Sequence, residues 1–254
     1  MPQQDPEPED RVVRIGDQDI VYTESGIRNG RGFVLVHGIG MGHRVFRDLA
    51  AALGAAGRVY ALDLPGFGDS PEPARAHTMA ESGDLVAAFV AQLKIPEPVL
   101  VGHSMGTQVV AEAAARHPDL SRSIVLIAPT VNARERTARR QAWRMLQDLI
   151  DENPRVIWVG AKQYLKTGPG WFLRKLRIML DHRVELTLPR VRADALVLRG
   201  SEDRVSPRDW VERVTAILPH ARMREIPDRG HEAMITDPDP VAAMIIEHAE
   251  AARG

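Results

Sequence analysis

The chain has 254 residues, with 33 Lys or Arg against 34 Asp or Glu, a formal net charge of -1 and no cysteine. This length fits one large α/β domain, and the charge balance gives no indication of binding to nucleic acid. The lack of cysteine excludes disulfides, thiolate metal sites and a cysteine nucleophile, and fits a reducing compartment. No apolar run reaches the roughly 20 residues that span a bilayer, and residues 1–10 do not resemble a signal peptide. We therefore expect a cytoplasmic protein with a disordered leader over residues 1–10.

The leader is followed by a predicted antiparallel hairpin, because residues 11–15 and 19–23 alternate apolar and polar side chains around a Gly-Asp turn. Short apolar runs typical of buried strands follow at 33–36, 59–62, 99–101, 124–127 and 196–198, with a more polar run at 223–226. Helical periodicity is found at 45–53, 79–93, 104–116, 207–217 and 240–252. The alternation predicts an α/β fold with a mostly parallel twisted sheet and helices on both faces. The carboxyl ends of its strands then share one edge.

One segment, residues 131–190, interrupts this alternation. It shows helical patterns without a strand between them, and it contains 13 Lys or Arg but only 6 Asp or Glu. Three of the four tryptophans, Trp143, Trp158 and Trp171, also lie in it. We interpret residues 131–190 as a helical cap or lid inserted into a core made of residues 11–130 and 191–254.

A possible nucleophile follows the apolar run at 99–101. Gly102-His103-Ser104-Met105-Gly106 has the form G-x-S-x-G and stands between a predicted strand and a predicted helix. On such a tight turn the serine hydroxyl is pushed out of the fold, and the glycines give the turn the room it needs. A serine hydroxyl still needs a base and a group that holds the base. Asp203 and His231 each follow a predicted strand, so both are expected at the same sheet edge as Ser104.

Four separated motifs agree in order with a known pattern: His37-Gly38-Ile39-Gly40, the loop Asp63-Leu64-Pro65-Gly66-Phe67-Gly68-Asp69-Ser70, the serine turn, and the loops that carry Asp203 and His231. From Val12 to its end the chain resembles the α/β-hydrolase superfamily, specifically esterase-like serine hydrolases with a small helical cap. The resemblance implies Ser104 as nucleophile, His231 as general base and acid, and Asp203 as the acid that orients His231. It also implies that the backbone N–H groups of Ile39 and Met105 receive the oxyanion.

Other residues receive more modest expectations. Met41, His43, Trp143, Trp158, Trp171 and Phe172 are candidates for the lining of an acyl pocket, although aromatic residues in an insert commonly form its own small core. His37 is expected to brace the oxyanion loop, and His103 to pack beside the serine turn. No H-E-x-x-H pairing follows His231, and no other cluster has metal-ligand spacing, so we predict neither a metal nor a cofactor.

Within the superfamily, several classes are disfavoured. A serine at position 104 argues against the epoxide hydrolases and haloalkane dehalogenases, which carry an aspartate there. Glu232 after His231 is unlike the tryptophan common in C–C bond hydrolases, and Met105 is unlike the tryptophan of the serine aminopeptidases. What remains is a carboxylic ester hydrolase acting on a small acyl ester. Alternatives are a thioesterase or lactonase, including one acting on an acyl carrier, and a non-hydrolytic ligand-binding or biosynthetic protein on the same fold.

Overall fold

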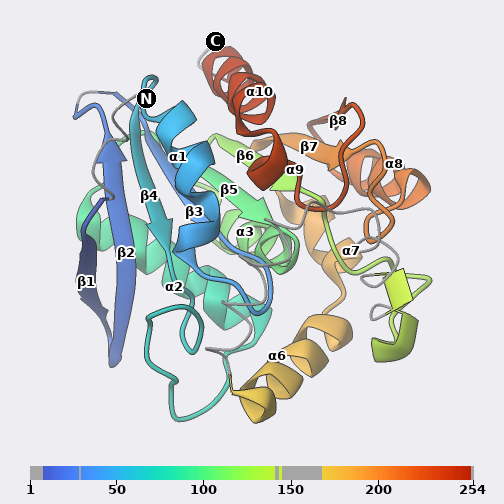
Figure 1. The fold of residues 1–254 in the computed structure, drawn as a ribbon, viewed down its shortest axis with the longest axis horizontal. Coiled ribbons are helices and arrows are strands. Elements are labelled where there is room, and N and C mark those ends of the chain that lie inside the picture. Colours follow the sequence, from blue (N-terminus) through green and yellow to red (C-terminus); the bar gives the residue numbers. More distant parts are fainter. Residues whose placement is uncertain (1–7, 29, 141–142, 145–167, 253–254) are drawn as a thin grey trace, which may run out of the picture.

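The computed structural model describes residues 8–28, 30–140, 143–144 and 168–252 and contains an eight-stranded sheet (Figure 1). The strands are β1 Asp10–Ile15, β2 Gln18–Gly26, β3 Gly32–Val36, β4 Arg58–Leu62, β5 Val99–His103, β6 Ser123–Ile127, β7 Asp194–Gly200 and β8 Ala221–Ile226. Their order in the sheet is β1-β2-β4-β3-β5-β6-β7-β8. Strand β2 pairs antiparallel with β1 and with β4, and the remaining neighbours pair in parallel. The predicted fold class is confirmed.

The position of each strand in the sheet explains its composition. Every residue of β3, β5 and β6 is buried, because these central strands are covered on both faces. Strand β8 lies at the sheet edge and is mostly half-buried, which accounts for its more polar sequence. Strand β1, at the opposite edge, begins at Asp10, and residues 1–7 of the predicted leader lie outside the described residues.

The predicted helices are present, with small shifts at their ends. The helical elements are η1 His43–Phe46, α1 Arg47–Leu53, α2 Met79–Leu93, α3 Met105–Arg116, α6 Pro169–Asp181, α7 Val184–Thr187, η2 Leu188–Arg190, α8 Arg208–Ile217, α9 Ala233–Thr236 and α10 Pro238–Ala251. Helix α2 begins with a capping box, in which the backbone N–H of Glu81 donates to Thr78 Oγ1 and the N–H of Thr78 donates to the Glu81 carboxylate. Helix α10 begins two residues before its predicted start, because Pro238 suits the first turn of a helix.

Two apolar clusters lie on the two faces of the sheet. One contains residues of α2, α3 and α8, among them Val86, Val109 and Val211. The other contains residues of α1 and α10, among them Leu49 and Ile245. Figure 1 shows α1 and α10 together on one face and α2 and α3 on the other. The sheet is therefore held between two helical layers, which leaves the carboxyl ends of its central strands free to carry loops.

The described part of the 131–190 insert packs near the carboxyl ends of the central strands. Arg136 donates to the carbonyls of Leu180 and His182, which joins the start of the insert to the end of α6. From α3, the side-chain amide of Gln108 donates to the carbonyl of Met179 at 3.2 Å. The end of α6 therefore lies against α3 at Gln108, which is about one helical turn from Ser104. Residues 145–167 lie outside the described residues, and none of the described helices is long and apolar enough to cross a bilayer.

Candidate active site

Ser104 sits on a sharp turn between β5 and α3. Its backbone has φ 52° and ψ -119°, a conformation that non-glycine residues rarely adopt. The turn leaves no room for side chains at its two glycines: a Cβ on Gly102 would lie 2.4 Å from the carbonyl oxygen of Gly106, and one on Gly106 would lie 2.1 Å from that of Val36. The G-x-S-x-G pattern is therefore required by the close approach of β5, β3 and the first turn of α3.

The structure brings Asp203 and His231 to Ser104. The Nε2 atom of His231 lies 3.0 Å from Ser104 Oγ, and its Nδ1 atom lies 3.0 Å from Asp203 Oδ2. All three side chains are buried. With Nδ1–H donating to the carboxylate, Nε2 is left as the acceptor for the serine hydroxyl. The three residues form a continuous chain of hydrogen bonds, although they come from widely separated parts of the sequence.

Asp203 is fixed by the loop that carries it. Its Oδ1 atom accepts hydrogen bonds from the backbone N–H groups of Val205 and Ser206, at 2.8 and 2.7 Å. Burial by itself would raise the pKa of this carboxyl, but the charge and hydrogen bond of His231, together with the Ser206 N–H, outweigh it and hold the pKa below its usual value. Asp203 is therefore suited to remain a carboxylate beside His231.

Arg199, which the sequence analysis did not single out, also fixes the loop that carries Asp203. Its buried guanidinium donates to the backbone carbonyls of Ser201, Asp203 and Ser206, and it pairs with Glu225. One arginine at the end of β7 thus holds both sides of the loop around Asp203. The signal for it was weak, since a single charged residue at the end of an apolar strand has many possible explanations.

The loop after β3 lies against Ser104. A Cβ on Gly38 would come within 3.1 Å of Ser104 Cβ and 3.4 Å of Met41 Sδ, so a larger residue would fit here only if these side chains moved by a few tenths of an ångström. His37 fixes the loop, because its Nε2 accepts the N–H of Leu64 at 3.0 Å and its Nδ1 lies 2.7 Å from the carbonyl of Gly38. Burial lowers the pKa of His37, in keeping with a neutral ring. Ile39 follows in this loop, and Met105 begins α3 on the other side of Ser104.

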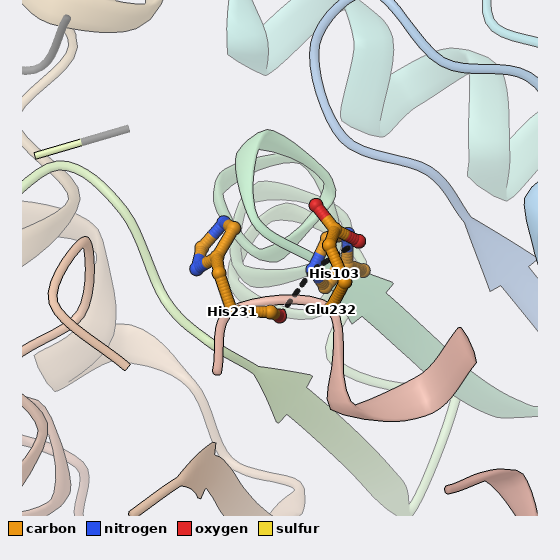
Figure 2. Close-up of side chains that lie close together, drawn as sticks. All are labelled: His103, His231 and Glu232. Atoms are coloured by element: carbon orange, nitrogen blue, oxygen red, sulfur yellow. Dashed lines mark hydrogen bonds and ion pairs between the residues drawn. The ribbon is translucent and has the colours of Figure 1, made fainter. Parts of the chain in front are cut away.

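His103 has a role that the prediction of simple packing missed. Figure 2 shows its ring beside the segment that carries His231 and Glu232, with Nε2 3.1 Å from the carbonyl oxygen of His231. Burial lowers the pKa of His103 to about 3, with the nearby His231 ring acting in the same direction. A neutral His103 therefore donates through Nε2 and holds the backbone of the residue whose side chain faces Ser104.

The residues suggested for a pocket lining lie in different surroundings. Met41 is buried beside Gly38, and His43 is buried with Nδ1 2.9 Å from Asp63 and Nε2 3.1 Å from Asp10. Trp171 is buried with its ring against Gly66, Phe172 is half-buried, and Trp143 is largely exposed. Trp158 lies outside the described residues. Among the described members of this set, Met41 lies in the loop after β3, where its backbone N–H donates to the carbonyl of Gly38 at 3.3 Å.

The carboxylate of Asp63 fixes the shape of the loop that follows β4. Its carboxylate accepts the backbone N–H groups of His43 and Asp69, and a Cβ on Gly68 would collide with it at 2.2 Å. The buried Asp63 therefore joins the segment before α1 to the Pro65–Ser70 turn. His43 belongs to this junction, with its ring nitrogens directed to carboxylates.

Two clusters in the described residues bring three potential metal-ligand atoms within 4.8 Å of one another: His103, His231 and Glu232, and Asp10, His43 and Asp69. In the first cluster, both ring nitrogens of His231 already lie at hydrogen-bonding distance from Asp203 and Ser104. A metal bound there would have to displace one of these partners. The geometry of this cluster therefore fits a hydrogen-bonded chain better than a metal site.

Comparisons with known proteins agree with this architecture. The profile of a family described as "Alpha/beta hydrolase family" matches residues 33–244. A pimeloyl-[acyl-carrier protein] methyl ester esterase of Chromobacterium violaceum is 25% identical over 87% of this chain and 95% of its own. The dihydrolipoyllysine-residue acetyltransferase component of an acetoin cleaving system from Pseudomonas putida is 35% identical over 88% of this chain and 65% of that protein.

A solved structure shows the same fold. A thermophilic esterase from Thermogutta terrifontis superimposes with a TM-score of 0.81 and 22% sequence identity, covering 97% of this chain and all of its own. At this identity the likeness concerns the arrangement of the backbone, and the chemistry must be argued from the side chains around Ser104.

Proposed function

Because this chain belongs to the alpha/beta hydrolase family, we propose that it hydrolyses carboxylic esters through an acyl-enzyme formed on Ser104. The observation that carries the proposal is the chain of contacts from Ser104 Oγ through His231 to Asp203, with 3.0 Å at each step. A relative named as a methyl ester esterase supports the same class of reaction. The lack of cysteine is in keeping with a cytoplasmic enzyme.

In the first half of the proposed reaction, the oxygen of Ser104 attacks the ester carbonyl while His231 Nε2 takes its proton. The bond to the leaving alcohol then breaks, and the same proton is given to that alcohol. Asp203 holds the Nδ1–H tautomer and stabilises the imidazolium that forms between these steps. In the second half, His231 Nε2 takes a proton from water while the water oxygen attacks the acyl carbonyl. The bond between the acyl carbon and Ser104 Oγ then breaks, and His231 returns the proton to Oγ as the acid leaves.

The negative charge on the carbonyl oxygen is proposed to be met by the N–H groups of Ile39 and Met105. Gly38 brings the first of these segments against Ser104, and the N-terminal end of α3 brings the second. The dipole of α3 acts in the same direction. Loss of one such donor commonly costs about 3–4 kcal/mol of transition-state stabilisation. We further propose that residues 131–190 form the cap over this site.

Turnover of short p-nitrophenyl esters by the wild-type protein and by Ser104→Ala tests the proposal. We expect the substitution to abolish turnover and to abolish labelling by a fluorophosphonate probe, whose adduct should map to the peptide containing Ser104. Ser201, half-buried on the loop before Asp203, provides the matched control, since Ser201→Ala should retain both. Equal turnover by wild type and Ser104→Ala would remove the assignment, and a tight ligand recovered unchanged would favour a non-hydrolytic role.

A second candidate, hydrolysis of an acyl group held on an acidic carrier protein, rests on the insert. Its described part exposes several arginines, including Arg139, Arg140 and Arg183. One relative is named for an ester carried on such a protein. Basic side chains on a surface accelerate encounter with an acidic partner, and salt screens that attraction. This candidate predicts that turnover of a carrier-bound substrate falls steeply with ionic strength, whereas turnover of a small ester does not.

A further inference from the structure

Helix α6 carries a buried cation that the proposed reaction does not use. The side chain of Lys175 is 2% exposed, and its ammonium donates to the backbone carbonyl of His77 at 2.9 Å. An ammonium has three protons to donate, and within the described residues this carbonyl is the hydrogen-bond acceptor found for it. Burying a charge without a counter-charge is costly, so its retention needs an explanation.

The acidic group whose charge acts on Lys175 does not serve as its partner. That group is Glu81, and its carboxylate is already bound by Arg75 and by the N–H and hydroxyl of Thr78 in the cap of α2. Burial lowers the pKa of Lys175 to about 8, which is the expected response of an ammonium that lacks a close carboxylate. The part of the chain that the structure describes contains no ion pair to this lysine.

Two neighbouring polar atoms are also unsatisfied. The indole Nε1 of Trp171, one helical turn before Lys175, is buried without a hydrogen-bond partner, and so is Nδ1 of His77. Trp171 and Lys175 lie four residues apart on α6 and are both buried, so they share one face of the helix. We call Trp171 and Lys175 the donor cluster. An indole N–H and an ammonium are donors only, so within the described residues the indole N–H and two of the three ammonium protons lack an acceptor.

The donor cluster lies along α6 between two features of the candidate active site. Trp171 packs on Gly66 of the loop that also holds Asp63, and the carbonyl of Met179 is bound by Gln108, one turn from Ser104 on α3. Lys175 is midway between Trp171 and Met179, about 6 Å along the helix axis from each. The charge of Lys175 also acts on His37 in the oxyanion loop.

We propose, on the basis of the ester hydrolysis argued above, that the donor cluster binds a carboxylate carried by the substrate, so that the enzyme prefers esters with an anionic group. The carboxylate supplies the missing acceptor for Lys175. Such an ester lies with its carbonyl at Ser104 and its anionic end at α6. The proposal assigns Lys175 to specificity and gives it no part in the bond-breaking steps.

Matched pairs of p-nitrophenyl esters test the proposal. In each pair the acyl chains have equal length, from about four to eight carbons, and end either in a carboxylate or in a methyl group. We expect the wild-type protein to prefer the carboxylate member of at least one pair. Lys175→Met should lower kcat/KM for that ester roughly tenfold to a hundredfold, mainly through KM, because a charge-assisted hydrogen bond is lost. The neutral ester should change by less than about threefold.

Two further variants separate recognition from structure. Lys175→Arg keeps the positive charge and should recover part of the preference for the carboxylate ester. Trp171→Phe keeps an aromatic ring against Gly66 but removes the indole N–H. It should therefore weaken the preference for the carboxylate ester and leave turnover of the neutral ester unchanged. Equal losses on both members of a pair in Lys175→Met, or no preference in the wild-type protein, would overturn the proposal. A different result would be that free glutarate inhibits the wild-type protein but not Lys175→Met, with no preference between the esters of a pair. This result would show that the donor cluster binds a separate anion, and it would also overturn the proposal.

The test also distinguishes this proposal from the proposed function. Ser104→Ala lacks the nucleophile but retains the donor cluster, so equilibrium binding of the same ester pairs to it reports on recognition without turnover. Tighter binding of the carboxylate member, lost in the Ser104→Ala, Lys175→Met double variant, supports the donor cluster even if hydrolysis fails. If turnover of the neutral ester requires Ser104 but both members of a pair bind equally well to Ser104→Ala, the proposed function stands and the role of the donor cluster in substrate binding is disproved.

Discussion

The side chain of His103 contacts the backbone of His231: Nε2 of His103 lies 3.1 Å from the carbonyl oxygen of His231, and the centroids of the two rings lie 5.1 Å apart. His103 is the last residue of β5 and immediately precedes Ser104, so one short segment fixes both the serine and the loop of His231. The distance between Ser104 Oγ and His231 Nε2 is therefore set partly by a residue that touches neither atom.

Replacement of His103 tests this positioning role. His103→Phe keeps an aromatic ring but loses the donor to the His231 carbonyl, so we expect kcat to fall about tenfold or more with little change in KM, because the geometry of proton transfer is loosened. His103→Gln can still donate and should retain more activity. Steady-state kinetics on a neutral ester measures both. Wild-type kcat in His103→Phe would show that the loop of His231 holds its position without this bond.

The same buried histidine predicts how stability depends on pH. The pKa of His103 is about 3 in the folded protein and about 6.5 when the chain is unfolded, so the unfolded state binds more protons between these values. Stability is therefore lost as the pH falls below about 6.5. His37 and His248, whose pKa values are also lowered by burial, act in the same direction.

His103→Gln removes one of these groups. Between pH 7.5 and 5.0 it should lose about 2 kcal/mol less of its unfolding free energy than the wild-type protein loses. Denaturant unfolding at the two pH values measures this difference. His220→Gln, the same substitution at an exposed histidine, is measured alongside as the matched control. An identical loss in His103→Gln and wild type would mean that His103 is protonated equally in both states.

The sequence predicted the sheet and most helices because buried central strands and capped amphipathic helices have local signatures. The strands β3, β5 and β6 are short apolar runs, and α2 carries its own capping box in Thr78 and Glu81. The positions of Ser104, Asp203 and His231 at one sheet edge also followed from strand ends. Contacts such as those of Arg199 with three carbonyls, or of Lys175 on α6 with the carbonyl of His77, depend on how distant segments pack, and no local pattern encodes them.

Asp203→Asn tests whether this carboxylate orients His231. The amide cannot stabilise the imidazolium and favours the wrong tautomer, so kcat should fall on the order of 10⁴-fold while the backbone contacts of the loop persist. Glu202 is the matched control, because it is the adjacent carboxylate and is exposed. Glu202→Gln should keep nearly full activity. Comparable losses in the two variants would show that the loop, and not the Asp203 carboxylate, is what the reaction needs.

Arg199→Met removes the guanidinium that donates hydrogen bonds to the loop around Asp203. Three carbonyl oxygens lose their donor, so the free energy of unfolding should fall by about 3–5 kcal/mol. Arg199→Met should also lower kcat, because Asp203 is less well held. Combining it with Glu225→Gln removes a carboxylate that, among the described residues, then pairs only with the exposed Arg208, so part of the stability should return whereas kcat should stay low. Thermal unfolding and ester kinetics measured on both variants separate the two effects. Recovery of kcat together with stability would show that Arg199 serves the fold alone.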